Sequence, residues 1–496
     1  MVLPNFNPCC LNSVPRKLAK VLFIAMAVCL TTHHTLSIAE DEVDDPFTTL
    51  LVSPAGEPVP ALKYDLLPPP AELLPGNAAT IYLRATKAKG EEFRKKMGEA
   101  SDWLRQPLEE FNVEEARKYL RQVSGVFDYL DRAARRESCD WEYPLGEEPA
   151  IMILLPDVQE MRSLARLLAV KARLEIVEGR FDDAIHTLQT GYALGQHDAK
   201  TPFLVCKLVG IAITNIMSER LSELIRQENA PNMYWALTKL PRPLFSIRDA
   251  IDTEGRSLEL TFSIFENLDK LHSVESIQQE FDDSIDMLSE FSMATAMEKI
   301  FGVPMGDAQE VLMAVSLTGY PKARRFLIEE QGLSAEVVDA MPVAQVVFLY
   351  SRDVYNIIRD EKFKLFYVDY NQDTVEKFDK KDKYIFENAR SMEIIPFAQT
   401  FLPTIQGSLI AQNRIQRQIE ALRVVEAVRM QAADNGGTLP VSLDDITVVP
   451  VPKDPLLQRP FTYQVQDSEA LLTTQAPKKW PNDRIRYRII LRKTDK

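Results

Sequence analysis

The chain has 496 residues, a length that suits about two to four domains. Its apolar fraction of 46% and charged fraction of 26% exclude wholesale disorder, a collagen-like fibre and a polytopic membrane protein. The formal net charge of −14 excludes a general electrostatic affinity for nucleic acid, so we expect no nucleic-acid partner.

The first 39 residues have the order of a signal peptide. Basic residues between positions 16 and 20 precede an apolar stretch at 21–30, and Ser37-Ile38-Ala39 follows. This order predicts cleavage after Ala39 and export to the periplasm or cell envelope. The apolar stretch is much shorter than the roughly 20 residues of a bilayer span, so we expect no stable membrane span after cleavage. An uncleaved signal would instead anchor the chain at its N-terminus.

Only two cysteines, Cys139 and Cys206, remain after the signal peptide. Two cysteines so far apart do not make a disulfide scaffold, and we expect two separately buried thiols, although export leaves their pairing open. The sequence has no CxxC, HExxH or other zinc-ligand spacing, and it indicates no cofactor. His197, near the end of a predicted helix, is expected to act as a cation at the negative end of the helix dipole.

Residues 40–76 are acidic and then rich in proline, with eight prolines from Pro46 to Pro75. Proline fixes φ and removes a backbone donor, so this region is predicted to be an extended strap or linker. Apolar residues between the prolines suggest that the strap lies along the surface of the following domain.

Residues 77–405 are predicted to form an α-helical domain. Apolar residues recur at spacings of three and four from residue 77 to about 143. Asp157 and Glu160 have the form of a capping box that opens a helix, Gly179 suits its C-terminus, and a second helix starts at Phe181. Two helices joined by so tight a turn make an antiparallel hairpin.

The hairpin carries small and aromatic residues at a characteristic spacing: Ala172, Gly179, Phe181, Ala184 and Gly191. This pattern resembles a tetratricopeptide repeat, in which small residues let the helices approach and the aromatic fills the gap. Glu175 stands where an aromatic is usual, and Gln196 replaces the usual proline. Such repeats need stacked neighbours, and no second clean copy follows. We therefore expect one tetratricopeptide-like hairpin within an irregular solenoid or bundle.

Further helices are predicted over residues 202–226, 232–240, 247–291, 307–317, 335–341, 343–366 and 388–435. Residues 204–217 are apolar nearly all round, which predicts the most buried helix of the domain. Gly319-Tyr320-Pro321 is predicted to end the helix that begins at Asp307.

Residues 406–496 are predicted to form a long helix followed by a small β-sheet. The spacing of apolar residues changes after Gly437. Residues 461–466, 470–474 and 485–491 alternate or are rich in residues that favour β-strands, with turn residues between them. These segments predict three antiparallel strands packed on the helix at 415–432. The expected fold class is mainly α, an irregular helical-hairpin solenoid or bundle with a small C-terminal sheet on a long helix.

Several short motifs follow the long helix: Gly437-Thr-Leu-Pro440, Ser442-Leu-Asp-Asp445, Asp454-Pro455 and Arg459-Pro-Phe-Thr-Tyr463. This ending resembles the C-terminal half of a type II secretion pseudopilin, in which a helix packs on a small sheet through a Pro-stabilised loop. No prepilin leader sits immediately before the helix, so the resemblance does not imply filament assembly. In some pseudopilins the loop holds calcium, which makes Asp444, Asp445 and Asp454 candidate oxygen donors; we favour solvated loop carboxylates.

The whole chain resembles a family of exported helical proteins abundant in planctomycete bacteria. The stretches that carry this resemblance are residues 60–68, 75–79, 178–185 and 230–237. The resemblance implies location and fold, and it implies no activity.

Three functions remain open from the residues. The first is a non-enzymatic interaction or scaffold protein of the cell envelope, whose partner is a protein or an envelope glycan. The second is a helical-fold hydrolase acting on glycans or peptides, for which Asp182–Asp183 and Asp282–Asp283 with Asp286 are the densest carboxylate clusters. The third is a secretion-associated component, based on the pseudopilin-like ending alone. No nucleotide-binding loop is visible, and we favour the first function.

Overall fold

The computed structural model describes residues 47–88, 101–144, 157–256, 263–280, 308–368, 405–466, 468–476 and 484–492, with a few single positions between them. The predicted signal peptide lies outside the described residues. The helices are α2 (Ala78–Ala88), α4 (Val113–Gln122), α5 (Ser124–Ala134), α6 (Asp157–Val177), α7 (Phe181–Asp198), α8 (Leu204–Ile225), α9 (Tyr234–Thr238), α10 (Arg248–Gly255), α14 (Ala308–Glu329), α15 (Ala335–Asp339), α16 (Val343–Phe363) and α19 (Ile405–Asp434). The strands are β1 (Thr48–Val52), β2 (Leu74–Asn77), β3 (Arg136–Ser138), β4 (Lys453–Asp454), β5 (Arg459–Pro460), β6 (Thr462–Gln466), β7 (Glu469–Thr473) and β8 (Arg486–Leu491). The predicted class, mainly α with a small C-terminal sheet on a long helix, is confirmed.

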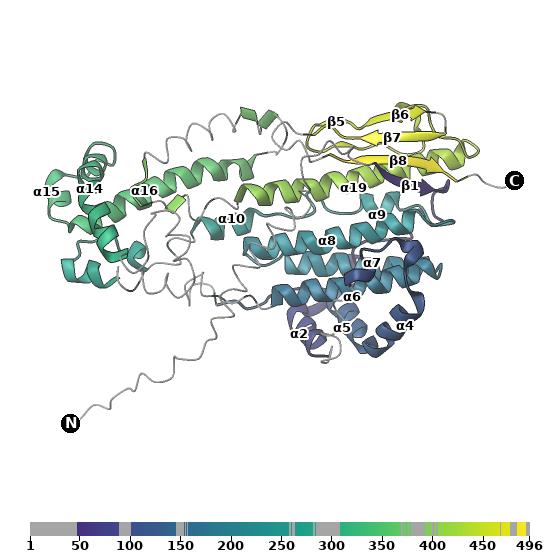
Figure 1. Cartoon of the computed structure of the whole chain (residues 1–496), viewed down its shortest axis with the longest axis horizontal. Coiled ribbons are helices and arrows are strands. Elements are labelled where there is room, and N and C mark those ends of the chain that lie inside the picture. The colour runs from purple at the N-terminus through teal and green to yellow at the C-terminus, as the bar shows by residue number, and fades with distance from the viewer. Residues whose placement is uncertain are drawn as a thin grey trace, which may run out of the picture.

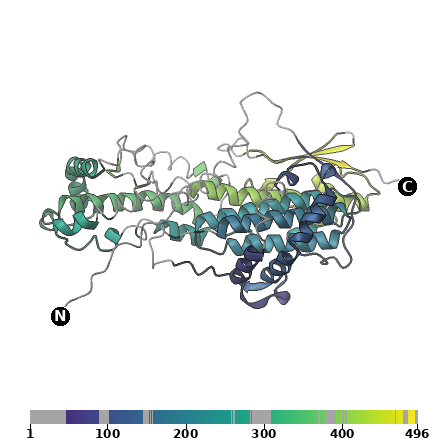
Figure 2. The same cartoon turned by 60° about the horizontal axis from the view of Figure 1, so that its bottom comes forward.

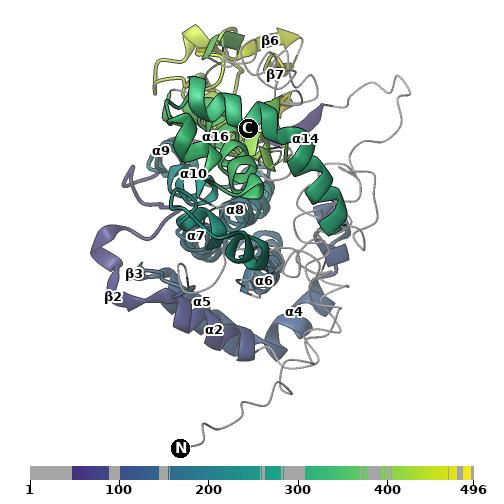
Figure 3. The same cartoon turned by 90° about the vertical axis from the view of Figure 1, so that its left-hand side faces the viewer.

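The elements form an elongated body whose layers are seen end-on in Figure 3. The sheet lies at one side, α7 and α8 lie in the middle with α6, and α2, α4 and α5 cover the opposite side. Helices α16 and α19 follow one another along the long axis (Figures 1 and 2). None of the described helices is long and apolar enough to cross a bilayer.

Helices α6, α7 and α8 pack against one another to form the centre of the body (Figure 1). Gly179 ends α6 with φ of +72°, a left-handed conformation that glycine adopts without strain. The Gly179 and Arg180 amides donate to the carbonyls of Ile176 and Glu175, which closes the helix end. The predicted hairpin therefore forms with the predicted turn.

The buried apolar residues fall into two clusters. The larger one joins helices α2 to α9 with α19 and the sheet, and the smaller one joins α10, α14, α15 and α16 with the first turns of α8 and α19. Leu422 and Val425 of α19 are completely buried in the larger cluster. The long helix thus shares one core with the helical hairpins, because it packs on α8 and α9 as well as beneath the sheet.

The sheet has the order β1-β8-β7-β6. Strands β6, β7 and β8 are antiparallel, as predicted, while β1 pairs in parallel with β8 and places Leu50 beside Ile489. Strand β1 comes from the proline-rich strap, where no strand was predicted. It forms because residues 47–53 contain no proline and because side chains alternate along the strand, which buries Leu50 and Val52 in the core.

The helix predicted to end at Gly319-Tyr320-Pro321 continues instead to Glu329, with Pro321 inside α14. A proline removes one helical hydrogen bond, and this loss is offset by packing, since Ala323 and Leu327 are buried against the second core. The predicted helix 247–291 is interrupted after Gly255, where α10 ends.

Candidate functional site

Three segments that are distant in sequence meet at the turn between α6 and α7. They surround a shallow hollow of about 390 Å³. Its lining comes from the strap, the α6–α7 turn and the loop before α9: Tyr64, Gly179, Arg180, Phe181, Asp182, Asp183, Asn229 and Pro231. We call this surface the turn hollow.

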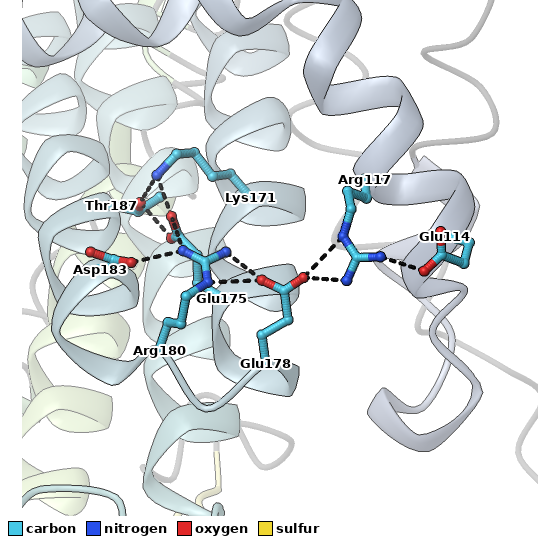
Figure 4. Close-up of polar contacts among 8 residues, drawn as sticks. All are labelled: Glu114, Arg117, Lys171, Glu175, Glu178, Arg180, Asp183 and Thr187. Carbon is cyan, nitrogen blue, oxygen red and sulfur yellow. Dashed lines mark hydrogen bonds and ion pairs between the residues drawn. The ribbon is translucent and has the colours of Figure 1, made fainter.

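Glu178 links the turn hollow to α4 (Figure 4). Its carboxylate accepts hydrogen bonds from Arg117 of α4, at 2.6 Å from Nη2, and from Arg180, at 2.8 Å from Nε. Arg180 also donates to Asp183 at 2.8 Å. Burial raises the pKa of Glu178, but the hydrogen bonds from the two guanidinium groups outweigh it and leave this pKa below its usual value.

Glu175 forms the inner part of the same network. Its side chain is buried, and it accepts a hydrogen bond from Thr187 Oγ1 at 2.7 Å and another from Lys171 Nζ. Arg180 Nη1 lies 3.7 Å from the carboxylate. Glu175, which stands where the tetratricopeptide pattern usually has an aromatic, is therefore the buried carboxyl group that ties α6 to α7 (Figure 4).

Asp182 ties the strap to the start of α7. Its carboxylate lies 3.0 Å from Lys63 Nζ and accepts a hydrogen bond from the Tyr64 hydroxyl at 2.8 Å. The hydrogen bonds from Lys63 and then Tyr64 lower the pKa of Asp182. A general acid for hydrolysis needs a raised pKa, so the lowered pKa of Asp182 does not suit that role. The neighbouring carboxylate, Asp183, is paired with Arg180.

The residues of the repeat-like pattern have structural roles, and two of them also line the turn hollow. Gly179 forms the turn, Phe181 is partly buried against the core, and Ala184 is completely buried. A Cβ on Gly191 would lie 2.2 Å from Sδ of Met217, so the absence of a side chain at this position lets α8 pack closely on α7.

Two residues of the other carboxylate cluster, Asp282 and Asp286, lie outside the described residues.

Two of the three candidate calcium donors, Asp445 and Asp454, have other partners. Asp445 accepts hydrogen bonds from the Ser442 amide at 2.8 Å and from its hydroxyl at 3.0 Å. Ser442 is the N-cap of a short 3₁₀ helix, Leu443–Asp445, that contains both Asp444 and Asp445. Asp454 is buried, not solvated as we favoured, and its carboxylate lies 2.9 Å from Nη2 of Arg417. Within the described ranges, no group of three or more His, Cys, Asp or Glu side chains is placed to hold a metal ion.

Cys139 and Cys206 are both buried and are not joined in a disulfide, as expected. The interpretation of His197 as a helix-capping cation is wrong, because its ring is buried and neutral. The Tyr82 hydroxyl lies 3.0 Å from Nδ1 of His197. Burial and then the charge of Lys200 lower the pKa of His197 to about 3, against a smaller opposing effect of a hydrogen bond with the Arg136 backbone.

No protein-family model, curated protein or solved structure matches the chain. The resemblances to pseudopilins and to the exported helical family stay predictions from the sequence.

Proposed function

We propose that the protein is an exported, non-enzymatic interaction or scaffold protein of the cell envelope, and that the turn hollow contacts its partner. One observation carries this proposal: the carboxylates of Asp182 and Asp183, which line the hollow, are both paired with cations. This arrangement gives a fixed, open surface. It differs from the pocket of convergent, unpaired carboxylates that a glycoside hydrolase needs.

The composition of the turn hollow suits a protein partner. Arginine and aromatic residues are enriched where protein interfaces derive most of their binding energy, and the hollow presents Arg180 beside Tyr64 and Phe181. Arg180 is 44% exposed, and Asp182 and Asp183 are 67% and 60% exposed. The ion pairs already hold these side chains in place, which reduces the entropy lost when a partner binds.

Site-directed photo-crosslinking tests this proposal. Phe181 is replaced by a photoreactive phenylalanine analogue in the full chain, which is then irradiated in envelope extracts of the source organism. Tyr367, which is 55% exposed and lies in another part of the body, receives the same analogue as a control. We expect a discrete protein adduct from position 181 that is absent from position 367 and is lost with Arg180→Glu. The absence of any adduct specific to position 181 would contradict the proposal.

The envelope location is tested separately by the mass of the protein recovered from cells. Cleavage after Ala39 predicts a mature chain that begins at Glu40 and is found in the envelope fraction. An intact N-terminus would indicate an anchored chain, and recovery in the cytoplasmic fraction would contradict export.

A further inference from the structure

We propose that Arg162 and Arg166, on the first half of α6, form a binding site for a phosphate- or sulfate-type oxyanion. The two residues are separated by one helical turn, so their side chains leave the same face of α6. The site lies away from the turn hollow, which is at the other end of this helix. The inference therefore goes beyond the proposed interaction function and does not depend on it.

The first argument is burial without a partner. Arg162 is only 9% exposed, and its Nε atom is buried with no hydrogen-bond partner among the residues that the structure describes. Arg166 is partly buried. Neither guanidinium group forms an ion pair or hydrogen bond with the residues that the structure describes. Removing a charge from water is costly unless an opposite charge compensates it.

The second argument is the contrast with other arginines of the same core. Arg173, further along α6, is completely buried, and its guanidinium lies 3.1 Å from Glu223 and donates to the Gln106 carbonyl at 2.7 Å. Arg220 of α8 lies 3.2 Å from the same Glu223. The described residues thus supply carboxylate and carbonyl oxygens to Arg173 and Arg220, and they supply none to Arg162 and Arg166.

The third argument is the local field, which is positive. Burial lowers the pKa of Arg166, and the nearby charges of Arg162 and Arg105 lower this pKa further. Arg105 belongs to the segment before α4, so positive charge reaches Arg166 from two elements. Its pairing with Asp102, at 3.4 Å between exposed groups, offsets little of this field.

These features define the chemistry of the ligand. Guanidinium groups present planar pairs of N–H donors that match the oxygens of phosphate, sulfate and carboxylate. A multiply charged tetrahedral anion compensates two or three guanidinium charges better than one carboxylate does. Inorganic phosphate and a phosphomonoester on a larger molecule present this same group.

Calorimetry and thermal unfolding of the full chain test the site. Inorganic phosphate is titrated at constant ionic strength maintained with sodium chloride. We expect saturable binding and a phosphate-dependent rise in Tm for the wild type, and a dissociation constant raised about tenfold or more in R166Q and R162Q. The matched control is R132Q, which removes an exposed arginine from α5 and should bind as the wild type does.

Two further measurements keep the test decisive if R162Q folds poorly. R166K retains the charge and loses the planar donor pair, so its binding should fall between those of wild type and R166Q. Without phosphate, R166Q should be at least as stable as the wild type, because an uncompensated charge has been removed. Equal stabilisation by chloride, or unchanged phosphate binding in R166Q, would overturn the proposal.

A titration with phenyl phosphate distinguishes the two sources of the anion. Affinity similar to that of inorganic phosphate assigns the site to a phosphate carried on a larger ligand. Binding of inorganic phosphate alone assigns it to the free anion. Both results support an oxyanion site, whereas binding of neither anion contradicts it.

Discussion

Glu426 and Arg429, one turn apart on α19, form an ion pair of 2.7 Å in which both side chains are completely buried. Glu426 also accepts a hydrogen bond from the Met233 amide at 2.8 Å, and Arg429 donates to the Ser53 carbonyl at 2.9 Å. This pair therefore connects the long helix to the loop before α9 and to the strap. Burial raises the pKa of Glu426, against the opposing effect of Arg429.

Glu426→Gln is expected to lower the free energy of unfolding by about 3–5 kcal/mol, because it leaves the Arg429 charge buried and uncompensated. Equilibrium unfolding in urea measures this loss. The control is Asp339→Asn, which breaks the exposed pair with Arg324 at 2.6 Å and should cost less than about 1 kcal/mol. Equal losses in the two variants would contradict the role of burial.

The buried His197 makes stability depend on pH. Its folded-state pKa of about 3 lies below the usual 6.5, so the unfolded chain binds more protons between these values. The contribution of His197 to the free energy of unfolding is complete above pH 6.5 and is lost as pH falls, with about 2 kcal/mol lost at pH 5. We expect His197→Gln to show a weaker fall in unfolding free energy between pH 7 and pH 5. Parallel curves for the variant and the wild type would show that His197 does not contribute.

Glu175→Phe tests whether the α6–α7 hairpin packs as a tetratricopeptide repeat does. It installs the usual aromatic but removes the acceptor of Thr187 and Lys171, so we expect a loss of about 2–4 kcal/mol. Val177→Phe adds an aromatic at a neighbouring position that is 40% exposed, and it should change stability by less than about 0.5 kcal/mol. An unchanged or higher Tm in Glu175→Phe would favour ordinary repeat packing.

Gly191→Ala tests the contact between α7 and α8. Its Cβ would overlap Met217, which is completely buried, so we expect a loss of about 1–3 kcal/mol. Gly125→Ala is the control, because no atom lies within 4 Å of its added Cβ, and it should leave stability unchanged or raise it by up to about 1 kcal/mol. Thermal unfolding measures the Tm of both variants, and an equal Tm in Gly191→Ala and Gly125→Ala would contradict the close approach of α7 and α8.

Local signals predicted much of this fold. The capping pattern before α6 and Gly179 after it are properties of a few adjacent residues, and so is the alternation along β8. Strand β1 was missed because it is short and lies between prolines, and its partner β8 is at the other end of the chain. Helix α14 continues past Pro321 because of packing against distant residues, which the local sequence does not reveal.

The candidate sites were predictable only in part. Asp182 and Asp183 were recognised as a carboxylate cluster, but Tyr64 and Asn229 reach the turn hollow from distant segments. The charged residues of α19 follow a spacing of three that suggests a solvated face, yet most of them are buried: Arg417, Glu420, Arg423, Glu426 and Arg429. Their burial arises from the elements that surround the helix, which a local pattern cannot report.

The most direct test of the interaction function measures binding and hydrolysis together on isolated envelope material. The purified full chain is added, and both the retained protein and the released sugars or peptides are quantified. The account predicts saturable retention that Arg180→Glu abolishes and Arg132→Glu leaves intact, with no product above a heat-inactivated control. Release of sugars or peptides above that control, or retention unaffected by Arg180→Glu, would contradict it.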